Sequence, residues 1–249
     1  MRDDLGYEMN SAPVHRVVSL VPSITETVAQ IRPDLVVGAT DYCVHPPDLD
    51  VHRVGGSKYP NLEKVFACQP DLVLANAEEN RKQDVEALRD KGIRVWVCFP
   101  RTAAQACESA ARMLTEALSL PRPEWIDSAS ALWSHPAPQR YRAVIPIWRK
   151  PWMVLGPNTF ATDVLRRLGV TNVFDDACEP YPRVTLDEIL DKDPDLVVLP
   201  DEPYRFTTDD GPSFFPDIDC ALVSGRHLTW HGPSLLEAHH LLRRQLHIG

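Results

Sequence analysis

The chain has 249 residues, of which 44% are hydrophobic and 24% charged, so its composition is that of a globular protein with one large or two modest domains. Its formal net charge of -9 argues against DNA or RNA as a partner, because non-specific affinity for phosphate backbones comes from clustered Lys and Arg. The six cysteines are scattered without a C-x-x-C pair or a zinc-like spacing, which is typical of reduced, buried thiols.

The start of the chain, 1–16, contains no apolar run of the kind that a secretory signal requires. No later stretch approaches the roughly 20 apolar residues of a membrane span. The sequence as written therefore predicts a cytoplasmic protein. A periplasmic or cell-surface location is the alternative if the N-terminus has been trimmed or wrongly assigned.

The first predicted element is a strand, 16–21, which is apolar on both faces as a buried parallel strand tends to be. The run 23–26 has the S-x-x-E form of a capping box and predicts a helix that begins after Ser23. A second strand, 35–39, leads into a loop that contains Tyr42. Both strands are expected in one parallel sheet.

The first half then continues as alternating helices and strands. A helix capped by Asn61 precedes a buried strand, 70–75, and helix 83–91 and strand 93–98 follow, divided by Gly92. This βαβα order predicts a parallel sheet with helices on both faces.

The second half repeats this plan. The cap, helix and Pro-Asp-Leu-Val strand unit at 61–75 recurs at 185–199, with the cap nine positions before the proline in both copies. The duplication predicts two α/β lobes, 14–100 and 141–249, joined by a linking helix within 101–140. Open α/β sheets bind ligands at the carboxyl ends of their strands, so a ligand is expected in the cleft between the lobes.

Several segments together carry a resemblance to a known family. They are, in the order of the chain, 16–26, 37–42, 61–63, 70–74, 155–159, 172–174 and 180–184. With these segments the chain resembles the helical-backbone metal-chelate receptors, the periplasmic binding proteins for vitamin B12 and iron chelates. The resemblance implies the class III periplasmic-binding-protein fold, with two Rossmann-like lobes, parallel sheets and a long, rigid linking helix.

The same resemblance implies a function. The chain is expected to capture a cobalamin-like corrinoid or another metal chelate between its lobes and to deliver it to an ABC importer. It carries none of the common catalytic motifs, such as G-x-S-x-G or H-E-x-x-H, so no enzyme activity and no required cofactor are predicted. Two alternatives stay open: an iron-siderophore binder on the same fold, and a cytoplasmic metal-binding protein or enzyme on the same scaffold.

Partners follow from the resemblance as well. Members of the family dock on the importer permease through an acidic residue on each lobe, and the first of those positions falls on Lys82, with Glu78 and Glu79 close to it. We expect a monomer, because each lobe of this plan buries its own apolar surface.

Aromatic residues near strand ends are the first candidates for ligand contacts. Tyr42 matches a ligand-contacting tyrosine of the vitamin B12 binders, where a flat ring lies against a flat chelate; it is otherwise an ordinary loop tyrosine. Trp148, Arg149 and Trp152 are expected in a loop after the first strand of the second lobe, although tryptophans there can equally cover the core. Phe160 lines either the ligand site or its own helix.

Charged residues near the strand ends are the second group. Glu79 and Glu202 follow corresponding strands of the two halves, where they bind ligand amides or hydroxyls, bind a cation, or only solvate a loop. A siderophore would favour cations in the site because such chelates are often anionic. These cations are Arg149, Lys150, Arg205 and Arg226.

The segment 226–233 contains two histidines that suggest a metal site. His227 and His231 are four residues apart with Trp230 between them, a spacing that on a helix places both rings on one face. Its glycines and proline favour a loop instead. The resemblance places His227 near an aromatic contact position of the vitamin B12 binders, where a neutral imidazole can coordinate cobalt or iron.

Overall fold

The computed structural model describes residues 1–248, and the chain divides into two compact units. The first unit comprises Met1–Pro100, Gln105–Asp127 and His231–Pro233, and the second comprises Arg101–Ala104, Ser128–Trp230 and the chain from Ser234 onward. Each unit therefore contains one short segment whose sequence neighbours belong to the other. The predicted linking range, 101–140, is divided between the units.

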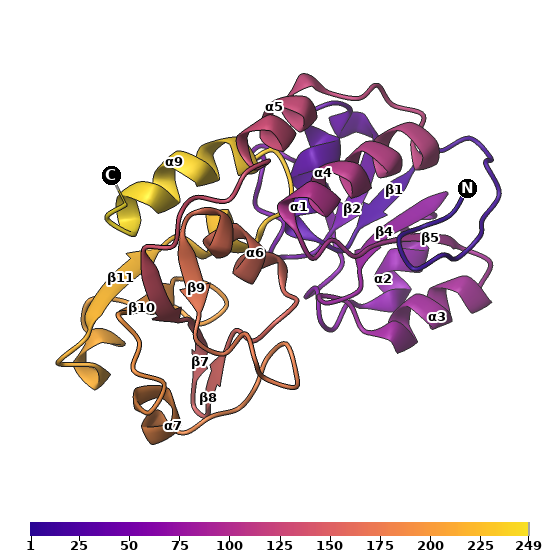
Figure 1. Ribbon diagram of the computed structural model, residues 1–249. Coiled ribbons are helices and arrows are strands. Elements are labelled where there is room, and N and C mark those ends of the chain that lie inside the picture. The colour runs from indigo at the N-terminus through magenta and orange to yellow at the C-terminus, as the bar shows by residue number, and fades with distance from the viewer. Residues whose placement is uncertain (249) are drawn as a thin grey trace. The chain divides into compact units, whose positions relative to one another are not determined.

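The first unit is built on a five-stranded parallel sheet with strand order β3-β2-β1-β4-β5. Its strands are β1 (Val17–Ser19), β2 (Val36–Ala39), β3 (His52–Arg53), β4 (Leu72–Asn76) and β5 (Arg94–Cys98). Its helices before β5 are α1 (Pro22–Ala29), η1 (Pro33–Leu35), α2 (Leu62–Ala67) and α3 (Lys82–Asp90). In Figure 1, α2 and α3 lie together on one side of these strands. The strands β1 and β4 are fully buried, because helices cover both faces.

The second unit contains a four-stranded parallel sheet with strand order β11-β10-β6-β9 and a separate two-stranded hairpin of β7 and β8. Its strands are β6 (Tyr141–Val144), β7 (Pro146–Arg149), β8 (Trp152–Val154), β9 (Val170–Asn172), β10 (Leu196–Pro200) and β11 (Asp219–Val223). Its helices are α6 (Phe160–Arg167), α7 (Leu186–Leu190), η3 (Pro212–Phe214), α8 (Gly225–Thr229) and α9 (Leu235–Gln245). Figure 1 shows this sheet with the hairpin as a separate pair of strands.

The repeated helix-strand unit is present in both halves, including the N-cap of its helix. The side chain of Asn61 accepts a hydrogen bond from the Lys64 N–H at the start of α2. At the start of α7, Thr185 and Glu188 form a complete capping box, in which each side chain accepts from the other residue's N–H. Both helices then lead into the buried strands β4 and β10 that were predicted from the sequence.

The capping box predicted at 23–26 does not form, so that prediction is wrong. Helix α1 begins at Pro22, with Val21 as an N-cap that makes no side-chain cap. Proline at the first helical position has its φ angle already set for helix, which moves the start ahead of Ser23. The Ser23 hydroxyl is buried inside the first turn and has no hydrogen-bond partner among the described residues.

The predicted linking helix is not one continuous helix. Helix α4 (Ala103–Arg112) runs directly into one π-helical segment, η2 (Met113–Ala117), and α5 (Glu124–Leu132) follows only after a break. Pro121 and Pro123 lie in this break, where their rings exclude regular helix. Within residues 1–248 no helix is both long enough and apolar enough to span a bilayer.

Candidate functional site

The loops that follow β2, β3 and β4 meet at the carboxyl edge of the first sheet. The turn after β2 carries Tyr42, whose side chain is 66% exposed. The guanidinium of Arg53 holds this turn by donating to the carbonyls of Thr40 and Cys43, both at 2.9 Å. A Cβ at Gly56, in the loop after β3, would lie 3.5 Å from the Tyr42 ring. The ring of Tyr42 is thus presented next to the neighbouring loop.

The loops after β3 and β4 are joined by hydrogen bonds. Lys58 Nζ donates to the Glu78 carbonyl at 3.2 Å, and Asn80 Nδ2 donates to the Ser57 carbonyl at 2.8 Å. The three loops therefore form one surface. This is also where the strand order of an open parallel sheet reverses, between β1 and β4, which is the usual position of a ligand.

Tyr59 belongs to this surface, and sequence reasoning missed it. Its side chain is 69% exposed, and the guanidinium carbon of Arg81 lies 4.5 Å from the centre of its ring. The sequence gives little indication of Tyr59 as a site residue, because the strand before it, β3, is only two residues long and its pattern resembles a loop. The Gly55-Gly56 pair just before Tyr59 was the one local sign of a tight turn.

Two buried asparagines determine the position of Glu79. Asn76 Oδ1 accepts hydrogen bonds from the backbone N–H groups of Glu78 and Glu79, at 2.7 and 3.3 Å. The Asn76 N–H in turn donates to Asn80 Oδ1 at 2.8 Å. Both asparagines are only 3% exposed, whereas Glu79 is half-buried. Sequence reasoning also missed this pair, although it brackets the two glutamates directly after a buried strand.

In the second unit the predicted loop 148–152 is a β-hairpin, so the loop prediction is wrong. Trp148 pairs with Met153, and Arg149 pairs with Trp152, across the antiparallel strands β7 and β8. The ring of Trp152 packs against three phenylalanine rings of the second core, with centroid distances of 5.5 to 6.3 Å. These are Phe206, Phe214 and Phe215. Trp152 therefore fastens the hairpin to the core.

Arg149 is held by a carboxylate and a hydroxyl. Its Nε lies 2.9 Å from Asp210 Oδ1 and donates to Tyr204 Oη at 3.2 Å. The Tyr204 hydroxyl donates to Asp210 Oδ2 at 2.5 Å. The hydrogen bond from Tyr204, with the nearby Arg149 cation, lowers the pKa of Asp210. Trp148 packs edge-on against the Tyr204 ring at 5.5 Å and stays 42% exposed.

The loop after β10 carries Glu202 and packs closely on the start of α8. The Gly225 N–H donates to Asp201 Oδ1 at 2.6 Å, and a Cβ at Gly225 would lie 2.6 Å from the Glu202 backbone nitrogen. Only glycine permits this approach. Glu202 is an exposed residue, yet desolvation of its carboxyl and the adjacent Asp201 raise its pKa, against the opposing charge of Arg226. Solvent around Glu202 screens part of this effect.

The predicted aromatic contacts differ in exposure. Tyr42 and Trp148 are exposed, and Trp152 is half-buried. Phe160, the first residue of α6, is 4% exposed, and Trp230 is 9% exposed beneath the guanidinium of Arg226, 5.1 Å from its ring centre. Tyr42 and Trp148 are thus the predicted rings that present the most surface.

The predicted metal pair is engaged in two separate sets of hydrogen bonds. His227 lies in helix α8, not in a loop as its flanking glycines suggested, and its ring contacts Ser224 Oγ at 2.8 Å and Glu237 Oε2 at 3.3 Å. His231 belongs to the first unit, where its Nε2 lies 3.0 Å from Asn76 Nδ2. In the described part of the chain, no three His, Cys, Asp or Glu side chains form a group that could hold a metal ion. Metal binding by the two histidines stays a prediction.

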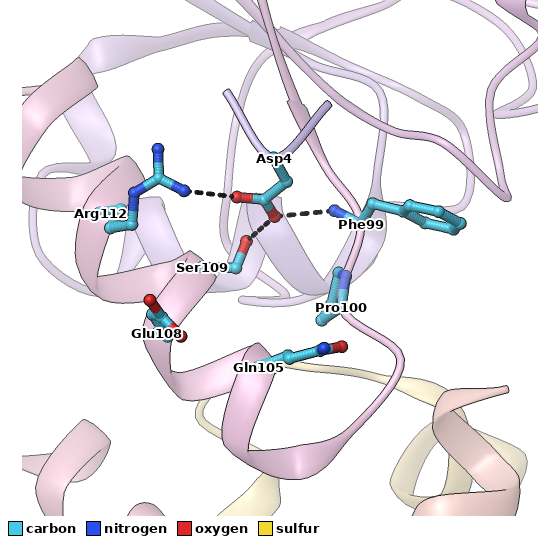
Figure 2. Close-up of a pocket in the computed structure, with 7 residues that line it drawn as sticks. All are labelled: Asp4, Phe99, Pro100, Gln105, Glu108, Ser109 and Arg112. Atoms are coloured by element: carbon cyan, nitrogen blue, oxygen red, sulfur yellow. Dashed lines mark hydrogen bonds and ion pairs between the residues drawn. The ribbon is translucent and has the colours of Figure 1, made fainter. Parts of the chain in front are cut away.

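A small cavity in the first unit is lined by none of these residues. It has a volume of about 190 Å³ and is lined by Asp4, Phe99, Pro100, Gln105, Glu108, Ser109 and Arg112 (Figure 2). The Asp4 carboxylate accepts from the Phe99 N–H at 2.8 Å, from Ser109 Oγ at 2.5 Å and from Arg112 at 3.2 Å, so its charge is already satisfied. A chelate needs a site larger than this, since ligand pockets usually exceed roughly 300 Å³.

Comparison with known proteins identifies the family. Residues 17–215 match the model of the periplasmic binding proteins. The chain belongs to the periplasmic binding protein family. A vitamin B12-binding protein of Vibrio cholerae is 26% identical over 198 residues, which cover 74% of this chain and 70% of the relative. One of Photorhabdus laumondii is 28% identical over 205 residues, covering 78% and 73%.

Solved structures confirm the predicted fold class. A periplasmic vitamin B12-binding protein of Vibrio cholerae has a TM-score of 0.76 at 21% identity and covers 95% of this chain and 98% of its own. A periplasmic heme-binding protein in complex with two hemes has a TM-score of 0.74 at 19% identity, covering 94% and 98%. The two-lobed α/β periplasmic-binding-protein fold predicted from the sequence is therefore present.

The predicted cytoplasmic location is wrong. It relied on the lack of an apolar run in 1–16 and of a later membrane span, whereas the match to periplasmic proteins extends over residues 17–215. The alternative of a cytoplasmic metal-binding protein or enzyme relied on the same missing signal and on Lys82 at the expected acidic docking position, and it loses the first of these two supports.

Proposed function

We propose that this chain is a substrate-binding protein that captures a cobalamin-like corrinoid and passes it to an ABC importer permease. The observation that carries the proposal is the similarity to vitamin B12-binding proteins over about three quarters of the chain. Binding and release without chemical change follow from this role, so the proposal includes no catalytic residue and no required cofactor.

The exposed tyrosines of the first unit are suited to a flat, largely apolar ligand. Tyr42 and Tyr59 stand on loops that hydrogen bonds hold at the carboxyl edge of the sheet. Tyrosine combines a broad ring with a polar tip, so it can cover a corrin face while its hydroxyl reaches an amide. Glu79 is proposed to accept hydrogen bonds from the amide groups at the periphery of the ligand. In the second unit, Trp148 is proposed to cover the ligand with its ring, and Glu202 is proposed to accept hydrogen bonds from ligand amides.

The charges favour a corrinoid over an anionic siderophore. Of the cations that a siderophore site would use, Arg149 is paired with Asp210, and Arg226 packs on Trp230 and faces Glu202. Recruiting them for a ligand would compete with these contacts and weaken the pairing of Asp210. Arg149 and Arg226 are therefore less available to bind a ferric siderophore, which is the alternative ligand.

Fluorescence titration with cyanocobalamin, cobinamide, heme and one ferric siderophore tests the proposal. We expect saturable quenching of tryptophan emission by the two corrinoids and weaker responses to the anionic chelates. Tyr42→Ala should weaken corrinoid binding by about tenfold, because a ring-sized apolar contact is lost. Tyr7→Ala removes an exposed ring outside the three loops and should leave the affinity unchanged. No saturable response to either corrinoid at micromolar concentrations would contradict the proposal.

The importer contact on the first unit remains part of the proposal. Lys82, at the expected acidic position, begins α3 with an 88% exposed side chain and lies 3.6 Å from Glu86. An exposed carboxylate is therefore available one helical turn away, in addition to Glu78 and Glu79. A monomer is proposed as the state that binds the ligand.

A further inference from the structure

The segment His231–Pro233 is built into the first unit although it lies late in the sequence. A Cβ at Gly232 would lie 2.8 Å from Thr27 Oγ1 and 2.9 Å from the Ser23 carbonyl, so glycine alone lets this backbone rest against α1. The preceding residue, His231, is 9% exposed and extends its ring to Asn76. The segment therefore connects α1 with Asn76, the last residue of β4.

The hydrogen bonds of Asn76 determine which nitrogen of His231 carries the proton. Asn76 Oδ1 accepts from the N–H groups of Glu78 and Glu79, so the oxygen of the amide must face the loop. Its Nδ2, which has only hydrogens to offer, then faces His231 Nε2 at 3.0 Å. Nε2 must supply a lone pair, and the imidazole must be neutral with its proton on Nδ1. Burial is consistent with this, because it lowers the pKa of His231 to about 4.

We propose that His231 is a positioning residue for Glu79: its Nε2 acceptor holds the Asn76 amide in the orientation that fixes the loop carrying Glu78 and Glu79. Only the link from this loop to ligand affinity rests on the proposed function. The hydrogen-bond relay from His231 to the loop stands without it.

Asn76 needs an acceptor for its Nδ2 because the side chain is buried. With its side chain buried, an Nδ2 without an acceptor carries a desolvation penalty, and a flipped amide would set its NH2 group against the backbone donors of Glu78 and Glu79. Either outcome loosens the loop. An acceptor at the place of His231 Nε2 prevents both.

Two variants separate this role from simple packing. His231→Phe keeps a flat ring of similar shape but has no acceptor, whereas His231→Gln offers an oxygen near the place of Nε2. We expect His231→Phe to speed hydrogen exchange at the Glu78 and Glu79 amides and to weaken cyanocobalamin binding by about fivefold to tenfold. His231→Gln should restore both values to near those of the parent.

The parent protein provides a measurement that needs no variant and no ligand. Two-bond ¹H–¹⁵N correlation spectra of histidine-labelled protein at pH 7 should show His231 neutral with its proton on Nδ1. A proton on Nε2 would overturn the proposal, and so would equal amide exchange and equal affinity in the Phe and Gln variants. If the spectra and the exchange rates agree with the proposal but cyanocobalamin does not bind, the proposed function fails and the positioning role stands.

Discussion

The burial of His231 makes the stability of the fold sensitive to pH. Its pKa falls from 6.5 to about 4, chiefly through desolvation, with the Asp4 carboxylate acting in the opposite direction. Between these values the unfolded chain binds a proton that the folded chain does not, so the free energy of unfolding falls as the pH is lowered through this range. The contribution is complete above pH 6.5, and about 3 kcal/mol is lost by pH 4.

Urea denaturation between pH 4 and 7.5 measures this dependence. The parent should lose stability toward acid more steeply than His231→Gln, because glutamine does not titrate. Subtracting the two curves removes the contributions of the carboxylates that both proteins share. Parallel curves for the two proteins would show that His231 titrates normally.

At the residue scale, the sequence suggests candidate side chains for the site but not the contacts between side chains. Tyr42 and Glu79 are predicted as ligand residues because they follow strands, where ligand residues gather, and Tyr42 also matches a ligand-contacting tyrosine of the vitamin B12 binders; both stay predictions. The contact of His231 with Asn76 joins residues 155 positions apart, and no local pattern encodes it. His227 and His231 were predicted to bind a metal because the sequence shows their spacing but not the residues that each of them contacts.

Helix caps in the two halves offer a matched test at the scale of elements. Thr185→Ala removes the capping box of α7 and should lower the free energy of unfolding by about 1 kcal/mol. Ser23→Ala removes a hydroxyl that caps nothing and has no partner among residues 1–248, so stability should stay equal or rise slightly. Thermal denaturation of both variants provides the comparison. A larger loss at Ser23 than at Thr185 would reverse the assignment of the caps.

The errors at this scale have local causes. The S-x-x-E pattern at 23–26 does not form a capping box because the ring of Pro22 makes α1 begin ahead of Ser23. The hairpin of β7 and β8 was read as a loop because its strands are short and its aromatic residues do not alternate with polar ones. Its pairing is favoured by the aromatic core beneath Trp152, which lies more than 50 residues further along the sequence.

At the scale of the whole molecule, ligand binding should appear as added stability. A ligand that binds only the folded protein adds about 2.7 kcal/mol to the free energy of unfolding at a free concentration of 100 Kd. Cyanocobalamin at that excess should therefore raise the Tm of the parent, and the same concentration should raise the Tm of Tyr42→Ala by less. Equal shifts in both proteins would place the corrinoid away from the loops after β2, β3 and β4.

The fold class could be predicted because two properties extend along the whole chain. Strands that are apolar on both faces alternate with amphipathic helices, and the helix-strand unit at 61–75 recurs at 185–199. The membership of Arg101–Ala104 and His231–Pro233 in the units opposite to their neighbours could not be predicted. Those assignments depend on packing between residues far apart in the sequence, and neither periodicity nor composition contains information about it.

The late segment His231–Pro233 also determines when the first unit can finish folding during synthesis. A chain leaves the ribosome from its N-terminus, and domains generally fold in that order. Here the first sheet is made early and ends with β5 at Cys98, but the imidazole that supports Asn76 and the glycine that packs on α1 follow only at positions 231 and 232. The nascent chain therefore carries an incomplete first unit until most of the second unit, Ser128–Trp230, has been made.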